Sequence, residues 1–377
     1  MANVVYIFGA GASRDFGFPL GLEIFSYAEA YSELDSEVGR KLKEVIAEIR
    51  GIMEILFPGL AGDREKYPAF EEVLTFLWDR FWTDHEKDRD FYNKVFEKYG
   101  HSQKVFESFV RFLGLTLLAA TDSATCQGKR LLLNRFIEEI DYSNNRISFI
   151  DFNYDTLVDD ALAICRVKGV IEDYTYTIPL YDVNDKFESF SPFERELIRS
   201  DGIQLLKPHG SVNLCFCPHR QANYGDGYFL VPRNLEKYWL NREKCPCCGS
   251  QLNSLIIPPL YNKREYIKEN AYKSGNRINF RATPEHFRTY VENGLQEVLA
   301  NADEFVIVGY SLPPYDFDFK NILIDGLVRN EKKNELKAKI ITKGKEEAER
   351  LAEIFGNLIP HVDIVADCGF LSHLNSL

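Results

Sequence analysis

The sequence predicts an α/β protein that combines a Rossmann-like parallel sheet, helices on both faces, a large helical insertion and a small zinc-binding module. Three observations predict this fold class. Short β-branched and aromatic runs alternate with segments of helical periodicity, which is typical of a buried parallel sheet. A long stretch with helical periodicity alone follows the first strand. Five of the eight cysteines fall between Cys215 and Cys248, which indicates a separate metal module.

Composition excludes several classes of protein. The chain has 377 residues, 45% of them hydrophobic and 14% aromatic, which is typical of a packed globular protein. A net charge of -12 argues against direct nucleic-acid binding, because phosphate neutralisation needs clustered Lys and Arg. No apolar run reaches the roughly 18 residues of a membrane span, and Met1–Ala12 lacks the basic start of a signal peptide. The cysteines are too few for a disulfide scaffold, so we expect a cytoplasmic protein.

The chain begins with a predicted strand, residues 4–8, which leads into Gly9, Gly11 and Ser13. Glycines let a bound group approach the backbone, and the start of a following helix favours an anionic pyrophosphate. The same pattern also fits a tight turn in any α/β domain. Arg14 occupies the third glycine position of the dinucleotide fingerprint, and no second strand with a terminal acid follows about 20 residues on. An ordinary hydride-transfer dehydrogenase is therefore disfavoured.

Residues 22–145 show helical periodicity, clearest over 36–56 and 70–81, and we interpret them as a helical insertion. The next predicted strand, 147–151, leads into Asn153 and Asp155. Polar residues that follow a parallel strand lie at the carboxyl edge of the sheet, where α/β proteins bind ligands. The simplest alternative is that Asp155 or Thr156 caps the following helix, which accounts for one of them but not for Asn153.

A third predicted strand, 203–206, ends in Lys207, Pro208, His209 and Gly210. A lone histidine is most often structural, yet the flanking proline and glycine fix and expose this turn. A histidine side chain can accept a proton at neutral pH, so His209 is a candidate base.

The cysteines that follow predict a structural zinc site. Cys245 and Cys248 have the two-residue separation with which two thiolates grip one tetrahedral ion. The predicted ligands are Cys215, Cys217, Cys245 and Cys248, with Cys247 or His219 as substitutes. The alternative is a set of unrelated buried cysteines.

The α/β alternation then resumes with predicted strands at 255–257, 304–308, 339–342 and 362–365, and helices at 283–300 and 345–355. The strand at 304–308 ends in Gly309-Tyr310-Ser311, and Asp316 and Asp318 are predicted to begin the next helix. The predicted division is a Rossmann-like domain of residues 1–21, 146–211 and 255–377, a helical insertion of 22–145 and a zinc module of 212–254.

Four predicted loops, 9–13, 153–155, 209–211 and 309–311, thus share one sheet edge, and together they resemble the sirtuin family. The resemblance implies that NAD is the substrate and that His209 is the catalytic base. It implies that Asn153 and Asp155 lie near the nicotinamide and share in catalysis. The implied cofactor-binding set is Gly9, Ala10, Gly11, Ser13, Asn153, Asp155, Gly309 and Ser311.

Two segments depart from the deacylase members of that family. Those members follow the first proline of this region with Asp-Phe-Arg, whereas residues 19–22 here read PLGL. After the zinc module they carry a Phe-Gly-Glu strand, whereas residues 258–261 here read PPLY. The helical insertion, the Asn-Tyr-Asp loop and the GYSLPP segment are more similar to the prokaryotic sirtuin-like NADases of antiphage defence. That branch implies hydrolysis of NAD+ to nicotinamide and ADP-ribose, a homo-oligomer and a partner such as a hexameric ATPase translocase.

Three other activities stay open at the level of sequence. The same site could serve an NAD-dependent protein deacylase, in which an acyl oxygen attacks instead of water. A catalytically silent NAD-binding sensor or scaffold would keep the binding loops without turnover. A cyclase would release cyclic ADP-ribose.

Overall fold

The computed structural model describes residues 1–60, 67–82, 94–95, 97–99, 102–176, 178, 180–182, 202–217, 229–232, 234–241, 244–245, 248–258, 282–313, 316–356, 358–365 and 369–374. The chain divides into two compact units. The first contains Met1–Gly17, Thr125–Arg233 and Lys244–Leu377, and the second contains Phe18–Ala124 and Asn234–Glu243.

A seven-stranded sheet organises the first unit, with strand order β11-β10-β9-β1-β2-β5-β3. Its neighbouring strands pair in parallel. The predicted Rossmann-like parallel sheet is therefore confirmed. Its strands are β1 (Ala2–Phe8), β2 (Asn145–Asp151), β3 (Tyr174–Tyr176), β5 (Ile203–Leu206), β9 (Glu304–Val308), β10 (Lys337–Ile341) and β11 (His361–Val365).

The chain builds this sheet outward from β1 in two directions. After β1 it adds β2, β3 and β5 on one side, and only later β9, β10 and β11 on the other. The order therefore reverses between β1 and β9. The crevice at the carboxyl ends of strands beside such a reversal is where open α/β sheets bind ligands.

Alternating side chains of the strands form two cores. Val5 and Ile7 point into a cluster that contains Phe287 of α12 (Ala282–Asn301), Leu323 of α13 (Phe317–Arg329) and Leu351 of α14 (Lys345–Gly356). On the opposite face, Tyr6 contacts Phe136 of α7 (Ala124–Glu138), and Phe8 contacts Phe370 of α15 (Gly369–Leu374). The period-two pattern of β1 thus buries both faces of the sheet, as in doubly covered α/β folds.

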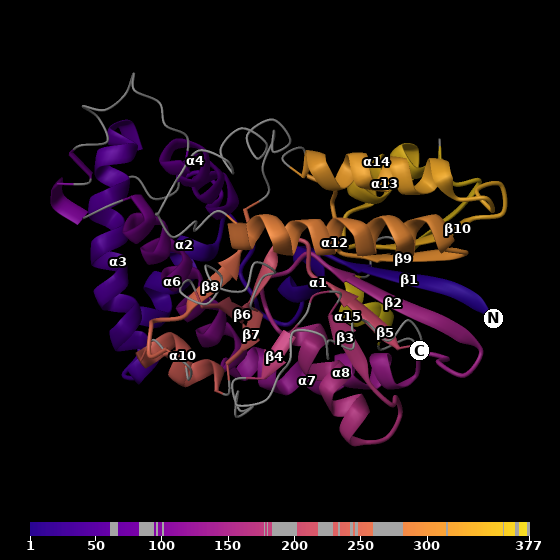
Figure 1. Ribbon diagram of the computed structural model, residues 1–377, viewed down its shortest axis with the longest axis horizontal. Coiled ribbons are helices and arrows are strands. Elements are labelled where there is room, and N and C mark those ends of the chain that lie inside the picture. Colours follow the sequence, from indigo (N-terminus) through magenta and orange to yellow (C-terminus); the bar gives the residue numbers. More distant parts are fainter. Residues whose placement is uncertain are drawn as a thin grey trace. The chain divides into compact units, whose positions relative to one another are not determined.

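Helices cover both faces of the sheet. Figure 1 shows α13 and α14 on one side of β9 and β10, and α7 and α8 on the other side of the unit. The helices of this unit are α1 (Ala10–Arg14), α7 (Ala124–Glu138), α8 (Leu157–Val167), α12 (Ala282–Asn301), α13 (Phe317–Arg329), α14 (Lys345–Gly356) and α15 (Gly369–Leu374).

A second sheet in the same unit has the order β4-β7-β6-β8. Its strands are β4 (Leu180–Asp182), β6 (Gly210–Phe216), β7 (Phe229–Val231) and β8 (Asn253–Ile256). The strand predicted at 255–257 therefore belongs to this sheet, where β8 pairs antiparallel with β6, and not to the parallel sheet. Gly210 has a φ of +73°, and an added Cβ there would lie 1.9 Å from the Leu255 carbonyl oxygen, so the turn into β6 requires glycine.

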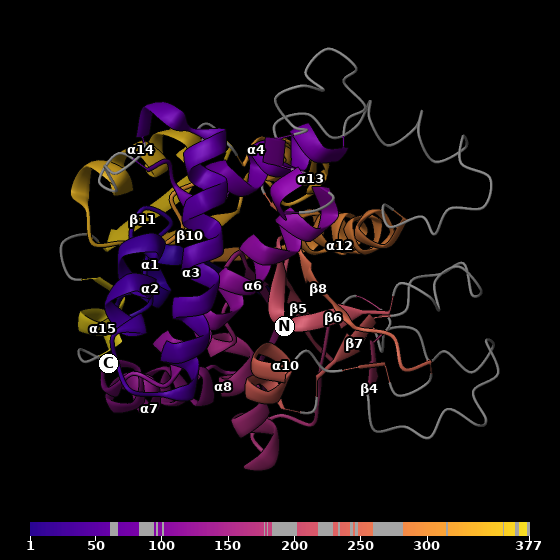
Figure 2. The ribbon, with the colours of Figure 1, turned by 90° about the vertical axis from the view of Figure 1, so that its left-hand side faces the viewer.

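The second unit is helical. Its helices are α2 (Ile24–Ser32), α3 (Glu37–Leu56), α4 (Phe70–Trp82), α6 (Ser102–Thr121) and α10 (Leu235–Asn241), with a 3-10 turn at Pro58–Leu60. Figure 2 shows α2 and α3 side by side. Ser36 caps α3 by accepting a hydrogen bond from the Gly39 N–H at 2.9 Å. Phe25 stacks on Phe112, and Phe70 packs against both, which fills the core of the unit.

Residues 234–243 belong to this helical unit although they fall within the predicted zinc module. Their helix α10 packs on α6 at Gly114, where an added Cβ would lie 2.4 Å from the Trp239 ring. The predicted three-part division of the chain stays a prediction.

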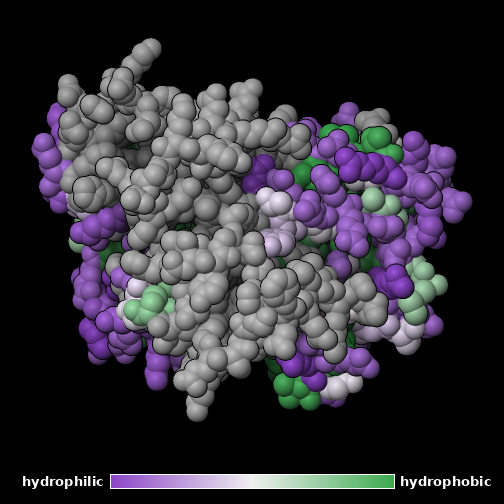
Figure 3. Space-filling model, in the orientation of Figure 1, coloured by the Kyte–Doolittle hydropathy of each residue, from purple (hydrophilic) through white to green (hydrophobic). Residues whose placement is uncertain are grey.

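Within the described ranges no single helix is long and apolar enough to cross a membrane; the consecutive helical segments Lys104–Thr121 and Cys126–Glu138 meet the length and composition test only when taken together. On the face drawn in Figure 3, the described surface is mainly hydrophilic with separate hydrophobic patches.

Candidate active site

Four loops meet at the carboxyl edge of four adjacent strands of the parallel sheet. They follow β9, β1, β2 and β5, which are neighbours in that order. Each predicted site loop, 309–311, 9–13, 153–155 and 209–211, begins within three residues of the end of its strand. The first two flank the reversal of strand order between β1 and β9. The sheet thus brings together the loops that sequence spacing alone could only suggest.

The two glycine loops pack directly against each other. The Gly9 N–H donates to the Val308 carbonyl at 3.0 Å, and the Gly11 N–H donates to the Gly309 carbonyl at 2.9 Å. An added Cβ would lie 2.5 Å from the Tyr310 Cα at Gly9, and 2.1 Å from the Ala12 nitrogen at Gly309, where φ is +58°. These glycines are therefore required by the contact between the loops, whatever else they bind.

The members of these loops differ in exposure. Ala10, Gly11 and Ser311 are exposed, whereas Gly9 and Ser13 are buried. The exposed three can face a ligand directly, and the buried two shape the backbone behind them.

Asn153 joins the second loop to the first. Its side-chain Nδ2 donates to the Gly9 carbonyl at 3.1 Å, and its backbone N–H donates to Asp151 Oδ1 at 3.0 Å. The residue is buried, with 7% of its surface exposed. The structure thus holds Asn153 against the glycine loop on one side and the end of β2 on the other.

Asp155 is 4% exposed and is held by groups of the protein itself. Its Oδ1 accepts the Leu157 N–H at 3.0 Å at the start of α8. Burial raises the pKa of this carboxyl, while Lys207 and a hydrogen bond from Ser13 act in the opposite direction. Asp155 therefore holds the first backbone N–H of α8, next to the N-cap residue Thr156, and also accepts a hydrogen bond from Ser13 of the glycine loop.

His209 lies in an aromatic environment with one nitrogen near a carboxylate. Its Nε2 is 3.4 Å from Asp316 Oδ2. Its ring centroid is 5.4 Å from that of Phe152 and 6.1 Å from that of Tyr154. Its Nδ1 is buried and has no hydrogen-bond partner among the described residues. A neutral ring nitrogen in this position can accept a hydrogen bond from a ligand or water.

Asp316 was predicted only to begin a helix, and the structure gives its side chain another use. It sits at the N-cap of α13, but its carboxylate makes no capping hydrogen bond. Its Oδ2 contacts His209 and also accepts a hydrogen bond from the Tyr310 hydroxyl. A carboxylate soon after a strand end was the only signal in the sequence, and it also fits a cap. Side-chain contacts of Asp318, the other predicted helix-starting acid, are not described.

Lys207 is a second residue whose importance only the structure reveals. Its side chain is fully buried, and Nζ donates to Asp151 Oδ2 at 2.8 Å, to Asp159 Oδ2 at 2.9 Å and to the Asp155 carbonyl at 2.6 Å. Burial raises the pKa of Asp151 to about 7, with Lys207 lowering it in part. The ammonium ties β5 to β2, α8 and the Asn153 loop. Asp151 thus accepts hydrogen bonds from both the Lys207 ammonium and the Asn153 backbone N–H.

Three of the four predicted zinc ligands lie together. The sulfur atoms of Cys217, Cys245 and Cys248 are all within 4.8 Å of one another, and those of Cys217 and Cys248 are 3.4 Å apart. Thiolates around one tetrahedral zinc ion at about 2.3 Å lie about 3.8 Å from each other, so this cluster could hold zinc.

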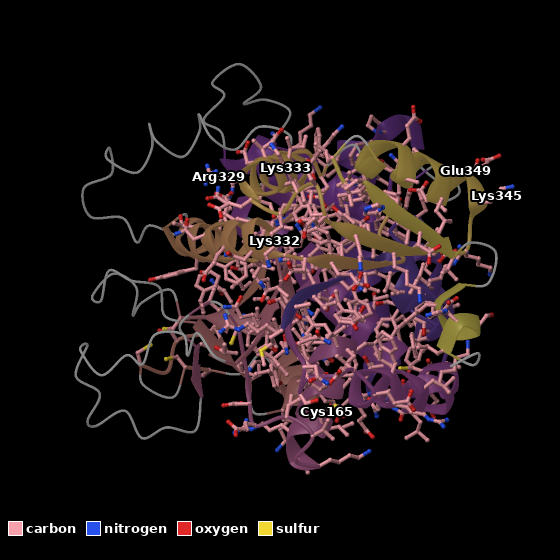
Figure 4. The ribbon with its side chains drawn as sticks, turned by 90° about the vertical axis from the view of Figure 1, so that its right-hand side faces the viewer. Cys165, Arg329, Lys332, Lys333, Lys345 and Glu349 are labelled. Carbon is pink, nitrogen blue, oxygen red and sulfur yellow. The ribbon has the colours of Figure 1, made fainter. Side chains whose placement is uncertain are left out.

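The remaining cysteines do not complete the cluster within the described residues. Cys215 is buried on β6 and is not one of its members. The predicted substitutes Cys247 and His219 lie outside the described residues. Cys126 and Cys165, the latter labelled in Figure 4 on α8, are buried elsewhere.

Comparisons with known proteins add little to this site. No family model matches the chain, and no curated protein matches it. Among solved structures, a mutant Sir2 homologue in complex with ADP-ribose is similar at a TM-score of 0.32 and 11% identity, over 99% of this chain and 90% of that one. A similarity at that level does not identify a function.

Proposed function

We propose that this chain is a sirtuin-like NAD+ hydrolase that releases nicotinamide and ADP-ribose. The observation that carries the proposal is the meeting of Asn153, His209 and two interlocked glycine loops at the carboxyl edge of the sheet, beside the reversal of strand order. This edge is the usual ligand site of an open α/β sheet. The motifs at these loops also resemble those of the sirtuin family.

In this proposal the loops divide the binding of NAD+ between them. The exposed Ala10, Gly11 and Ser311 contact phosphate and ribose, since their backbone and hydroxyl groups can reach a ligand. Gly9, Ser13 and Gly309 act by shaping the loops. Asp155 acts on the nicotinamide side through the segments that it fixes.

The reaction breaks the bond between the ribose C1′ and the nicotinamide nitrogen. The bonding electrons pass to the positively charged nicotinamide ring, which leaves as a neutral molecule. Water forms the new C–O bond at C1′, and we assign its proton to His209. Asn153 orients the water or the ribose, because its amide can both donate and accept. Such a transition state is oxocarbenium-like, as in other glycoside hydrolysis.

We further propose that Cys217, Cys245 and Cys248 hold a structural zinc ion, with Cys247 or His219 as candidates for the fourth ligand. The distances among the three sulfur atoms support this assignment. Zinc would stabilise the fold of the smaller sheet and take no part in the reaction.

The proposal is tested by incubating the protein with NAD+ and quantifying nicotinamide, ADP-ribose and cyclic ADP-ribose. We expect nicotinamide and ADP-ribose in equal amounts, lost in His209→Ala and kept in the control His361→Ala, since His361 is exposed on β11. Product that appears only with an acetylated peptide would instead indicate the deacylase. Cyclic product would indicate the cyclase, and NAD+ binding without any product would indicate the silent sensor.

The motif resemblance also leads us to propose a role in bacterial antiphage defence by NAD+ depletion. In this proposal the chain acts in the cytoplasm as a homo-oligomer, together with a partner such as a hexameric ATPase translocase. The corresponding measurement is the NAD+ content of phage-infected cells that carry the wild-type chain or His209→Ala. Equal NAD+ contents in the two would contradict the role.

A further inference from the structure

Two residues that the proposed chemistry does not use are built against the proposed base. Asp316 Oδ2 lies 3.4 Å from His209 Nε2, and the Tyr310 hydroxyl donates to the same oxygen. Asp316 is 4% exposed and Tyr310 is 4% exposed, so water screens this chain of groups little. His209 follows β5, whereas Tyr310 and Asp316 lie in the one connection between β9 and α13.

We propose that Asp316, held by Tyr310, is a positioning residue that places the proton of His209 on Nε2 and leaves Nδ1 as the proton acceptor. An ionised carboxylate only accepts hydrogen bonds, so the nitrogen that faces it must carry hydrogen. The other nitrogen of a neutral imidazole then has a free lone pair. That nitrogen, Nδ1, is the buried one without a partner among the described residues.

Aromatic packing keeps this arrangement rigid. Phe152 stacks on Tyr310 with ring centroids 4.2 Å apart, and it also contacts the His209 ring. Phe319 packs against the edges of both Phe152 and Tyr310. The orientation of Tyr310, and with it that of the carboxylate, is therefore fixed from two sides.

A purely structural role for Asp316 fits the contacts less well. A structural N-cap would direct its side chain to the backbone N–H groups of α13, and no such hydrogen bond is present. The carboxylate instead serves two side chains of the sheet edge. When Nδ1 takes up a proton, the imidazolium that forms is stabilised by the neighbouring carboxylate, as in other His–Asp pairs.

The first test measures the tautomer and needs no turnover. Protein labelled with ¹⁵N in its histidines is compared with His209→Ala, which assigns the His209 signals, and long-range ¹H–¹⁵N correlations then show which ring nitrogen carries hydrogen. We expect the Nε2–H form in the wild type and its loss in Asp316→Asn. The control Asp363→Asn, at an exposed position of β11, should leave the signals unchanged. An Nδ1–H form in the wild type would overturn the assignment.

The second test is kinetic and rests on the proposed function, since it follows NAD+ hydrolysis. Asp316→Asn should lower kcat by roughly 10²- to 10⁴-fold, the range expected when the base is held in the wrong tautomer, with little change in KM. Asp316→Glu should recover part of the loss, and Tyr310→Phe should lower kcat less than Asp316→Asn. A folded Asp316→Asn variant with wild-type kcat would refute the positioning role.

The two tests also separate the two ideas. If the wild type shows the Nε2–H form but does not hydrolyse NAD+, the proposed function fails and the tautomer assignment stands. If it hydrolyses NAD+ but the tautomer does not depend on Asp316, the proposed function stands and the positioning role of Asp316 fails.

Discussion

Lys207→Met is expected to be among the most destabilising single changes at the sheet edge. It removes the ammonium that Asp151 and Asp159 share while leaving both carboxyls buried. Breaking a buried ion pair in this way costs about 3–5 kcal/mol. The free energy of unfolding of a typical folded protein is only about 5–15 kcal/mol. We therefore expect Lys207→Met to lower the free energy of unfolding by about 3–5 kcal/mol, measured by urea unfolding followed by circular dichroism.

The stability that Lys207→Met costs should also depend on pH, and the pKa of Asp151 determines whether this cost grows or shrinks as pH rises. Its folded pKa of about 7 lies above the ordinary value of 3.8, so folding favours the protonated form, and its contribution to stability falls as pH rises between these values. Lys207 lowers this pKa, so its removal raises it further. Above pH 7 the variant then keeps a proton that the wild type has released. The cost of the substitution should therefore grow by up to about 1.4 kcal/mol per pH unit just above neutrality.

Lys332→Met is the matched control. Lys332, labelled in Figure 4, pairs with Asp303 at 2.6 Å, but its side chain is 57% exposed. Exposed pairs contribute at most about 1 kcal/mol. A second variant, Lys207→Met with Asp151→Asn, should recover part of the stability near and above neutral pH, because asparagine is neutral in the buried site without taking up a proton. The reasoning is refuted if Lys207→Met costs no more than Lys332→Met, or if its cost does not grow with pH.

Three further changes test other parts of the site. Gly309→Ala should destabilise the protein by a few kcal/mol and abolish NAD+ binding measured by calorimetry, because the added Cβ would lie 2.1 Å from the Ala12 nitrogen. Gly356→Ala is the control and should leave stability nearly unchanged, since the space around Gly356 is open. Asn153→Ala should lower kcat about 10²-fold or more by releasing the glycine loop and the water, and a variant with wild-type kcat would contradict that role. Zinc removal by a chelator, or Cys217→Ser, should lower the midpoint of thermal unfolding, and a protein without bound zinc by mass spectrometry would exclude the site.

Local patterns in the sequence were sufficient to predict the strands and the loops at their carboxyl ends. The β-branched run of β1 and the glycines after it are a local signal, as are the strands 203–206 and 304–308 and the loops that follow them. Polar residues after parallel strands could therefore be assigned to one edge from the sequence alone. The strand predicted at 255–257 is present as β8, but its pairing with β6 in the smaller sheet is a long-range contact that strand propensity does not encode.

The sequence by itself determined the parallel sheet, the candidate loops and the cysteine-rich segment, since each depends on neighbours within a few residues. Only the tertiary structure decided that Asp316 faces His209, that Lys207 holds the Asn153 loop, and that Cys215 lies outside the cysteine cluster. These contacts join residues from different loops and strands. Burial also decided their energetics, because a carboxylate that is well solvated at the surface becomes costly, and hence specific in its partners, once it is removed from water.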